Sequence, residues 1–389
     1  MIRTGFVFPA HGESWLGGAN YLRNLLTALA AAPDLGVQPV LLAGSGARLP
    51  LGFEDIELVR TLSLSVHQAL DARGLFRLLG REPLLDRILL RRRLDLLSHS
   101  GVLGQRARTP SMPWLFDVQH RHFPEFFNSR DLARRDELFS RSLREGVLVL
   151  VSSEAARMDV DHYFPGFADK LRVLRFVDGA AAAVQGTSRA ALEQKYSFQG
   201  RYLALPNQYW VHKNHALVLE ALALLQSRGR KVLVLSTGSP TDYRRPGHFD
   251  RLMQRRAESG LEENYRVLGV VPFADLAGLL RHATAILNPS LFEGWSSSVE
   301  EAKSLGKRVV LSDLPVHREQ APERALWFDP KSAEQLAEAI WTAWVADDAA
   351  AGDAAAVRAT LALPGRRRRF AEEYAAIAHE AIARAPPRR

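Results

Sequence analysis

Short apolar runs alternate with amphipathic segments along most of this chain. The opening run, residues 2–8, is almost continuously apolar, as expected for a strand buried on both faces of a parallel sheet. A helical pattern over residues 19–32 follows, with leucines recurring on one face, and a second apolar run occupies residues 37–42. A strand, a glycine-bearing loop, a helix and a strand form a βαβ unit, so the pattern predicts a doubly wound α/β sheet.

The alternation continues in two series, separated by a weakly patterned segment at residues 178–199. In the first series, residues 114–118, 147–151 and 171–176 are predicted to be later strands of the same sheet. The second series begins with a strand at residues 202–205. Its other predicted elements are strands 231–236, 266–268, 284–287 and 308–311, and helices 215–226, 249–259, 274–282, 299–305 and 333–346. The pattern therefore predicts two doubly wound, Rossmann-like units of similar size.

The length of 389 residues suits two or three domains of about 150 residues each. We predict an N-terminal Rossmann-like domain over residues 1–195 and a C-terminal Rossmann-like domain over residues 196–365. The alanine-rich residues 346–356 are predicted to be a loop or a helical link, and a final helix is predicted from about residue 366.

The composition, 47% hydrophobic and 24% charged, is that of an ordinary globular protein. The chain has no cysteine, which excludes disulfides and thiolate metal sites. Its first apolar run is too short for a signal peptide, and no stretch approaches the roughly 18 apolar residues that a membrane span needs. We therefore predict a cytoplasmic protein that does not cross a membrane.

The net charge of +8 leaves nucleic acid or an anionic membrane open as partners. Residues 74–97 interleave leucines with six arginines, and a basic amphipathic segment of this kind can lie on the inner face of a membrane. The alternative is two ordinary surface helices whose apolar faces join the core. The arginine run at residues 366–369 is most simply a solvated helix face.

The most informative stretch is residues 288–313, where Glu293 and Glu301 stand eight positions apart across a loop that runs into a helix. A helix N-terminus collects unpaired N–H groups and suits a phosphate, and the two carboxylates add acceptors for hydroxyl groups. Together these features describe a sugar nucleotide. The alternative is a capped helix without a ligand, because Ser297 with Glu300 and Ser298 with Glu301 each fit a capping box.

Glu293–x7–Glu301, after Pro289 and Ser290, resembles the signature of the retaining glycosyltransferases of family four, the "group 1" glycosyltransferases with the GT-B fold. The resemblance implies two Rossmann-like domains that face each other across a cleft, with a final helix, residues 366–389, that crosses back onto the first domain. It implies that Glu293 holds donor-sugar hydroxyls and Glu301 the ribose. The donor site would also include Gly294, Trp295, Ser296, Ser297, Ser298 and Val299. The three serines depart from the family, which often has Gly, an apolar residue and Pro there.

Lys213 opens a predicted helix and resembles the family's lysine that neutralises the donor diphosphate. Gln208 occupies the position where the family usually has an arginine, so Asn207, Gln208 or His212 would supply neutral hydrogen bonds instead. Taken alone, such a lysine is more often surface decoration. Two glycine sites also resemble family elements: Gly238 at a strand end facing the nucleotide, and Gly17 with Gly18 where backbone approaches the donor phosphates.

The segment from Trp114 to Phe127 concentrates Asp117, His120, His122 and Glu125 at and just past a predicted strand. Doubly wound sheets bind ligands at the carboxyl ends of their strands. By resemblance, His120 would order the donor sugar or the acceptor hydroxyl, and Asp117 would orient it. The alternative is a pair of solvated loop histidines. No third ligand accompanies them, so no metal site is predicted.

The resemblance implies a retaining, metal-independent transfer of a hexose from a nucleoside diphosphate sugar to a hydroxyl of a glycan or lipid-linked acceptor. Synthesis of cell-surface polysaccharide or lipopolysaccharide would be its setting, with no cofactor beyond the donor and no nucleic-acid partner. One rival is a sugar-nucleotide epimerase or a phosphorylase on the same fold. The other is a non-enzymatic module that uses its basic face on nucleic acid or membrane.

Overall fold

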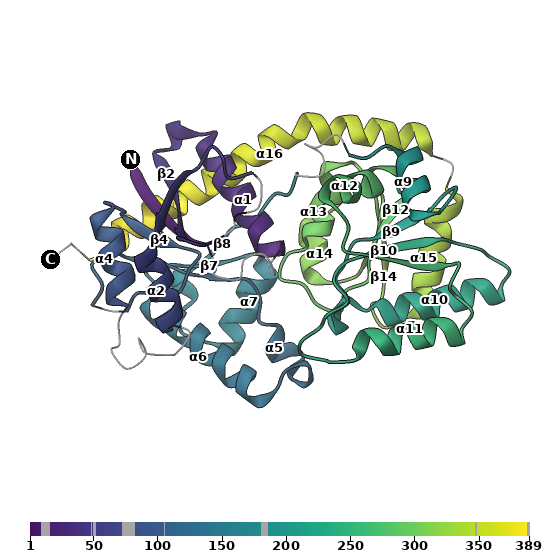
Figure 1. The fold of residues 1–389 in the computed structure, drawn as a ribbon, viewed down its shortest axis with the longest axis horizontal. Helices are drawn as coiled ribbons and strands as arrows, with labels where there is room; N and C mark the ends of the chain where they lie inside the picture. Colours follow the sequence, from purple (N-terminus) through teal and green to yellow (C-terminus); the bar gives the residue numbers. More distant parts are fainter. Residues whose placement is uncertain are drawn as a thin grey trace. The chain divides into compact units, whose positions relative to one another are not determined.

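The computed structural model describes residues 1–8, 16–47, 49, 52–71, 82–104, 106–179, 186–346 and 348–386 (Figure 1). Its contacts divide the chain into two compact units. Unit 1 comprises Met1–His122, Ser129–Val177 and Gly365–Arg389, and unit 2 comprises Phe123–Asn128 and Asp178–Pro364. Each unit contains a parallel sheet with helices, which confirms the predicted α/β class.

Unit 1 is built on parallel strands in two hydrogen-bonded parts, ordered β3-β2-β1-β4-β5 and β6-β7-β8. The strands are β1 (Ile2–Val7), β2 (Val37–Gly44), β3 (Glu57–Thr61), β4 (Leu96–Ser98), β5 (Ser111–Met112), β6 (Trp114–Leu115), β7 (Val149–Val151) and β8 (Leu171–Val173). The helices are α1 (Leu16–Ala30), α2 (Leu62–Asp71), α4 (Pro83–Arg91), α5 (Gln119–His122), α6 (Ser129–Glu145) and α7 (Glu154–Tyr163).

Pro113 separates the two parts of the unit 1 sheet, because a proline has no N–H to donate to a strand ladder. The parts are still joined by backbone hydrogen bonds on either side of it. Val147 N donates to Ser111 O at 2.9 Å, and Leu150 N donates to Pro113 O at 2.8 Å. The three later strands predicted for this sheet therefore continue it, although each is shorter than predicted.

The basic segment at residues 74–97 lies partly outside the described residues, which resume at residue 82. In its described part, α4 buries Leu85, Ile88 and Leu89 in a core cluster with strands β2 and β4. The apolar side chains here join the core, as the alternative interpretation requires. Arg87 and the arginines at positions 91–93 are exposed, so contact with a membrane surface stays a prediction.

Unit 2 is a six-stranded parallel sheet ordered β11-β10-β9-β12-β13-β14. The strands are β9 (Leu203–Leu205), β10 (Val234–Thr237), β11 (Tyr265–Gly269), β12 (Ala285–Asn288), β13 (Val309–Ser312) and β14 (Ala325–Phe328). The helices are α9 (Arg189–Tyr196), α10 (His215–Ser227), α11 (His248–Glu258), α12 (Phe273–His282), α13 (Ser297–Ser304), α14 (Pro315–Gln320) and α15 (Ala333–Val345). Every element predicted for the second series is present, with bounds shifted by at most three residues.

Two core clusters cover the two faces of the unit 2 sheet. One packs α10, α11 and α15 against the strands, and the other packs α9, α12 and α13 (Figure 1). Helices on both faces of a parallel sheet make a doubly wound unit. Leu192 of α9 is buried in the second cluster, which places this helix in unit 2. The contact boundary therefore lies at Val177/Asp178, earlier than the predicted boundary after residue 195.

The last helix, α16 (Ala349–Arg384), begins well before residue 366 and runs through Pro364. The alanine-rich residues that were predicted to be a loop or link are its first turns. Unit 2 ends at Pro364 and unit 1 resumes at Gly365, so the helix belongs to both units. In the arginine run, Arg368 pairs with Asp34 and is therefore more than a solvated side chain. Among the described helices, none is long and apolar enough to cross a membrane.

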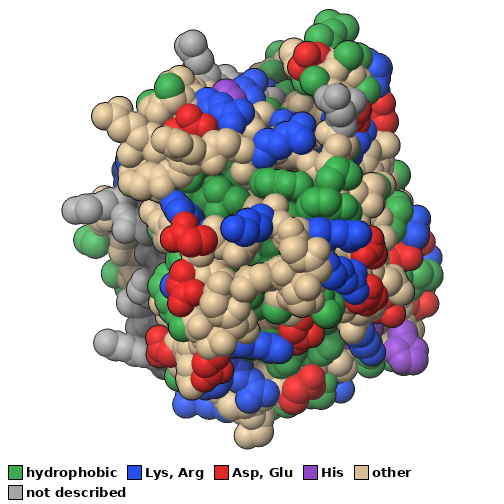
Figure 2. All heavy atoms as spheres, turned by 90° about the vertical axis from the view of Figure 1, so that its right-hand side faces the viewer, with side chains coloured by type: hydrophobic (Ala, Val, Ile, Leu, Met, Phe, Trp, Pro, Cys, Tyr) green, Lys and Arg blue, Asp and Glu red, His purple; other side chains and the backbone are tan. Residues whose placement is uncertain are grey.

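The solvent side of α10, α11 and α15 carries basic and acidic side chains side by side. Arg228 contacts Glu334 at 2.6 Å and Glu338 at 2.7 Å, and Arg255 of α11 contacts Glu220 of α10 at 2.9 Å. Figure 2 shows the same mixture of both charge signs on the right-hand side of the view in Figure 1. A surface of paired charges lacks the uniform basic patch that nucleic-acid binding needs.

Candidate active site

The topology of unit 2 identifies one edge of its sheet as the place for a ligand. From β9 the chain proceeds outward through β10 to β11, and then returns to the other side of β9 for β12, β13 and β14. The order therefore reverses between β9 and β12. Open α/β sheets bind ligands outside the carboxyl ends of the strands at such a switch point. The loops that leave β9 and β12 carry Lys213 and Glu293.

Lys213 ends a short 3₁₀ turn, η5 (Val211–Lys213), and the next residue fixes the exit of that turn. Asn214 adopts a left-handed conformation at φ 58°, which asparagine tolerates better than most residues. Its amide donates to Pro289 O at 3.1 Å and to Pro330 O at 2.9 Å. Asn214 thus ties the β9 loop to the β12 loop and sets the direction from which Lys213 approaches Glu293.

Glu293 and Lys213 form a largely buried ion pair. Lys213 Nζ lies 2.6 Å from Glu293 Oε1, and the side chains are 16% and 9% exposed respectively. Ser290 Oγ donates to the same carboxylate oxygen at 2.6 Å. Burial opposes ionisation of the carboxyl, but the Lys213 ammonium, His317 and the Ser290 hydrogen bond together hold the pKa of Glu293 below its ordinary value. The sequence prediction placed both residues at one ligand, and the structure brings them into contact.

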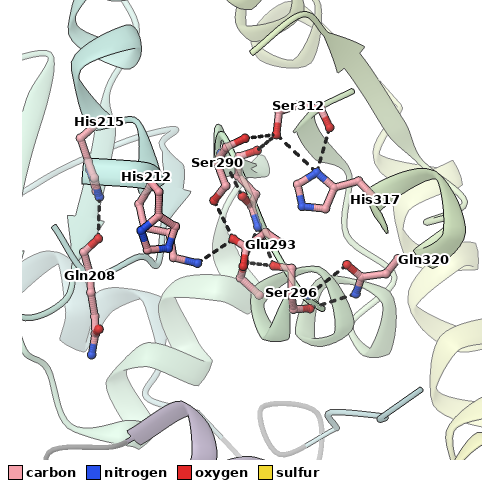
Figure 3. A network of polar contacts seen from close by, with 12 residues as sticks. Gln208, His212, His215, Ser290, Glu293, Ser296, Ser312, His317 and Gln320 are labelled. Atoms are coloured by element: carbon pink, nitrogen blue, oxygen red, sulfur yellow. Dashed lines mark hydrogen bonds and ion pairs between the residues drawn. The ribbon is translucent and has the colours of Figure 1, made fainter. Parts of the chain in front are cut away.

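The N-terminus of α13 is fixed by side chains that do not cap it. Ser296 is the N-cap residue, and its hydroxyl makes no capping bond. It accepts instead from Asn288 Nδ2 at 2.6 Å, and the same amide donates to Ser298 Oγ at 3.0 Å. Gln320 accepts from Ser296 N at 3.1 Å and donates to Ser296 O at 3.0 Å (Figure 3).

The alternative of a capping box is therefore wrong, because the N-cap is Ser296, one residue before the Ser297 box and two residues before the Ser298 box. The cap hydroxyl is also engaged elsewhere. A helix N-terminus without a side-chain cap keeps donors and the positive end of the dipole available to an anion.

The other predicted residues of this loop surround that N-terminus. Gly294 and Trp295 are half-buried, Val299 is fully buried in the core below, and Glu301 is 6% exposed on α13. On the same helix, Glu300 Oε1 accepts from Lys303 Nζ at 2.9 Å and from Gln320 Nε2 at 3.1 Å. The role predicted for Glu301 at a ribose stays a prediction.

A buried ion pair in the neighbouring loop braces the turn that carries Lys213. Asp242 and Arg244 have side chains 1% and 4% exposed, and Arg244 Nε lies 3.0 Å from Asp242 Oδ1. Asp242 Oδ2 accepts from Val211 N at 3.1 Å, and Arg244 Nη2 lies 3.3 Å from His212 Nδ1. The Arg244 guanidinium also covers the Trp210 ring at 4.8 Å. No sequence pattern reveals this brace, because Val211 and Asp242 lie 31 positions apart.

Gly238 permits the β9 and β10 loops to approach each other. Its φ is +136°, and a Cβ there would lie 2.5 Å from Asn207 O and 2.8 Å from Gln208 Cα. Only glycine fits this conformation and this contact. Beside it, Asn207 is buried and its Nδ2 has no hydrogen-bond partner among the described residues, whereas Gln208 O lies 3.1 Å from His215 Nε2. Asn207 thus keeps a donor at the position where a neutral hydrogen bond was predicted.

Asp117 and His120, the candidates in unit 1, are engaged in local structure. Asp117 Oδ1 accepts from Gln119 N at 3.0 Å at the start of α5. His120 is fully buried, with Nε2 3.0 Å from Asp136 Oδ1 and the ring edge-on to Phe139. Burial is the main reason that the pKa of His120 is lowered. The expectation of a solvated loop histidine is therefore wrong for His120, and its role toward a sugar stays a prediction.

The remaining predicted residues of that segment fall in different units. His122 Nε2 pairs with Asp159 at 2.9 Å in unit 1. Residues 123–128 group with unit 2 instead, where Phe123 meets the Phe292 ring edge-on at 6.3 Å and Glu125 O accepts from Arg245. Gly17 and Gly18 lie in the first turn of α1. Among the described residues, no group of three or more His, Cys, Asp or Glu could hold a metal ion.

His317 is the residue of this site that sequence analysis missed. It lies on α14, which was not predicted, and its ring is fully buried. Its Nδ1 lies 2.8 Å from Ser312 O and 3.3 Å from Ser312 Oγ, and Ser312 Oγ donates to Ser290 O at 2.7 Å. Figure 3 shows His317 beside the Ser290–Glu293 segment. A lone histidine after a strand carries no distinctive pattern, so only the packing reveals it.

Residues 201–350 match the family model described as "Glycosyl transferases group 1". Most of unit 2 therefore resembles the group 1 glycosyltransferases, as the sequence predicted. One curated relative, the "O-antigen chain mannosyltransferase B" of Escherichia coli, is 27% identical over 223 residues. That alignment covers 56% of each protein, so the chain matches about half the length of this relative.

Solved structures of glycosyltransferases share the fold over 98% of the chain. Anabaena HepE in complex with UDP and glucose superposes with a TM-score of 0.69 at 18% identity and over its full length. A glycosyltransferase from Rickettsia africae gives 0.67 at 15% identity over 98% of its length. WaaG, a glycosyltransferase involved in lipopolysaccharide biosynthesis, gives 0.58 at 16% identity over 98% of its length. These likenesses confirm the predicted GT-B fold of the chain.

Proposed function

We propose that this chain is a group 1 glycosyltransferase that moves a hexose from a nucleoside diphosphate sugar to a hydroxyl of a glycan or lipid-linked acceptor, with retention at the anomeric carbon and without a metal ion. The observation that carries the proposal is the buried Lys213–Glu293 pair beside the uncapped N-terminus of α13. An ammonium group and helix amides bind a diphosphate, and a carboxylate binds sugar hydroxyls. These groups converge at the switch point of the sheet, where a nucleotide is expected.

In this proposal Lys213 stabilises the leaving diphosphate. Negative charge grows on that group as the glycosidic bond breaks, and a fixed cation that meets the growing charge lowers the barrier. The amides from Ser296 to Val299 act on the same charge. Asn207 Nδ2, a buried donor with no partner among the described residues, supplies a neutral hydrogen bond where the arginine of the resembled family is replaced by Gln208.

Glu293 is proposed to position the sugar rather than to attack it. Its Oε1 already accepts hydrogen bonds from Lys213 and Ser290, and the resulting low pKa marks a well-stabilised carboxylate. Such a carboxylate is a good acceptor for hydroxyl groups and a weak nucleophile. We therefore favour front-face attack, in which the acceptor hydroxyl approaches the anomeric carbon on the side of the leaving phosphate and transfers its proton to that phosphate.

Cell-surface polysaccharide or lipopolysaccharide synthesis is the setting that we propose. The names of the relatives support it, since one is an O-antigen mannosyltransferase and WaaG is involved in lipopolysaccharide biosynthesis. An acceptor on a lipid would be met on the inner face of a membrane. The exposed arginines at positions 87 and 91–93 provide positive charge for a peripheral contact with that surface.

The test is turnover of GDP-mannose and of UDP-glucose, each with and without a panel of saccharide acceptors. We expect one donor to release its nucleoside diphosphate faster when an acceptor is present. The glycoside product should have the anomeric configuration of the donor, assigned from the one-bond C1–H1 coupling in NMR. Conversion of the donor alone into another sugar nucleotide would instead identify an epimerase. A requirement for inorganic phosphate would identify a phosphorylase, and either result would overturn the proposal.

A further inference from the structure

The His317 ring is buried with only one of its two nitrogens satisfied. Nδ1 contacts Ser312, whereas Nε2 has no hydrogen-bond partner among the described residues. The residue has no exposed surface. A buried polar atom without a partner is rare in a native protein and calls for an explanation, and a ligand that completes it is one of the recognised explanations.

The contact with Ser312 determines which nitrogen carries the proton. A carbonyl oxygen can only accept, so Nδ1, 2.8 Å from Ser312 O, must be the N–H donor. Burial lowers the pKa of His317, with Lys213 adding to this effect, while Glu293, the Ser312 bond and Asp313 oppose it. The net shift keeps the ring neutral at pH 7. Nε2 therefore carries a lone pair that can accept a hydrogen bond.

Hydrogen bonds join His317 to the loop that carries Glu293, through Ser312 and Ser290. His317 also contributes to the lowered pKa of Glu293. Ser312, which holds the ring, also donates to Ser290 O, and Ser290 donates to Glu293. Figure 3 shows these residues converging on the β12 loop, with the bonded nitrogen of His317 turned toward Ser312.

We propose that His317 Nε2 accepts a hydrogen bond from one hydroxyl of the donor sugar, and that Glu293 accepts a hydrogen bond from the neighbouring hydroxyl. This inference rests on the proposed function and names a specificity residue of that site. A neutral acceptor repels phosphate oxygens, which carry lone pairs, and pairs with a hydroxyl, which supplies a proton. His317 thus distinguishes a sugar that has a hydroxyl at one ring position from a sugar that lacks it.

Access to the buried nitrogen requires one neighbouring side chain to move, and Lys213 is suited to that movement. Its ammonium sits on a flexible four-carbon stem and is 16% exposed. When a diphosphate binds at the N-terminus of α13, Lys213 turns toward the phosphate and leaves Glu293. The position vacated beside Glu293 and His317 is then filled by sugar hydroxyls, which satisfy both acceptors.

Two substitutions separate this role from a structural one. His317→Asn keeps a side-chain N–H near Nδ1 for Ser312 O but removes the acceptor at Nε2. His317→Gln places an amide oxygen near the position of Nε2. The matched control is His282→Asn, at the last residue of α12. Helix α12 begins after the carboxyl end of β11 and leads back to the start of β12, so His282 lies at the amino ends of the strands, away from the site.

The experiment measures kcat/KM for GDP-mannose or UDP-glucose, whichever donor the wild type turns over, and for its deoxy analogues. We expect one analogue to lose about 10- to 100-fold in the wild type, because the buried acceptor is then left without a donor. His317→Asn should lose a similar factor on the parent donor and show no further loss with that analogue. His317→Gln should recover part of the loss, and the control should match the wild type.

The affinity for GDP or UDP alone should be unchanged in His317→Asn, because the nucleotide has no donor-sugar hydroxyl. If His317→Asn kept the wild-type ratio of kcat/KM between the parent donor and every deoxy analogue, the proposal would be overturned. Wild-type affinity and turnover of the parent donor in that variant would overturn it as well. Failure of the wild type to bind either nucleotide or to turn over either donor would instead contradict the proposed function.

Discussion

Lys213→Met is expected to lower kcat for glycosyl transfer by roughly 10²- to 10³-fold, the loss that follows removal of one group that stabilises charge in a transition state. The KM for the donor should rise less than kcat falls, because the charge on the diphosphate is greatest as the bond breaks. Steady-state kinetics with the turned-over donor measures both. Lys331→Met, at an exposed lysine of unit 2, is the matched control and should keep wild-type kcat.

Lys213→Met could lose activity through the lost charge stabilisation or through a destabilised fold. The second cause arises because the variant leaves Glu293 buried without its cation. The double variant Lys213→Met/Glu293→Gln removes that unpaired charge. We expect it to regain most of the thermal stability and none of the turnover. A double variant with near wild-type kcat would show that Lys213 serves the fold and not the reaction.

Breaking the same ion pair is also expected to destabilise the fold. Lys213→Met should lower the free energy of unfolding at pH 7 by about 3–5 kcal/mol, the usual cost of leaving one partner of a buried pair uncompensated. Glu293→Gln should cost less, because Lys213 is the more exposed partner and can extend toward water. Urea denaturation of the wild type and both variants gives these values.

The pH dependence of that loss follows from the direction of the Glu293 shift. In the wild type the pKa of Glu293 is lowered, so its contribution to stability is complete above the ordinary pKa of 4.5 and is lost as the pH falls through the lower, folded pKa. Without Lys213, burial raises that pKa, and protonation in mild acid relieves the unpaired charge. The difference between wild type and Lys213→Met should therefore shrink from pH 7 to pH 4.5. A difference that is independent of pH would contradict this explanation.

Much of unit 2 could be predicted because its elements are long and strongly periodic, and its loops carry recognisable chemistry. Lys213 and Glu293 were placed at one ligand from the sequence alone, and they are in contact. The strand order that puts their loops at a switch point was not predictable from periodicity. It depends on which strands pair, and pairing is decided by packing across the whole sheet.

Residues that act through contacts distant in sequence escaped prediction. His317 depends on α14, a helix of six residues after a strand, and the Asp242–Arg244 brace depends on the approach of two loops at Gly238. The capping-box alternative was wrong because α13 takes Ser296 as its N-cap, with Asn288 engaging the hydroxyls of Ser296 and Ser298, which the spacing of serines and glutamates cannot reveal.

The last helix was only partly predicted. A helix was predicted from about residue 366, and the alanine-rich residues 346–356 were predicted to be a loop or a helical link, whereas α16 is continuous from Ala349 to Arg384. Proline usually kinks or ends a helix, yet α16 contains Pro364. The surrounding structure outweighs a local preference there.

We propose that a nucleoside diphosphate binds at the N-terminus of α13 with its ribose at Glu301. We would measure thermal unfolding with UDP, GDP, ADP, dTDP and CMP for the wild type, for Glu301→Ala, and for Glu263→Ala at a glutamate whose side chain is 82% exposed. One nucleotide, at about 100 times its dissociation constant, should stabilise the wild type and Glu263→Ala by roughly 2.7 kcal/mol and leave Glu301→Ala unshifted. No shift of the wild type with any nucleotide, or a shift that persists in Glu301→Ala, would contradict the account.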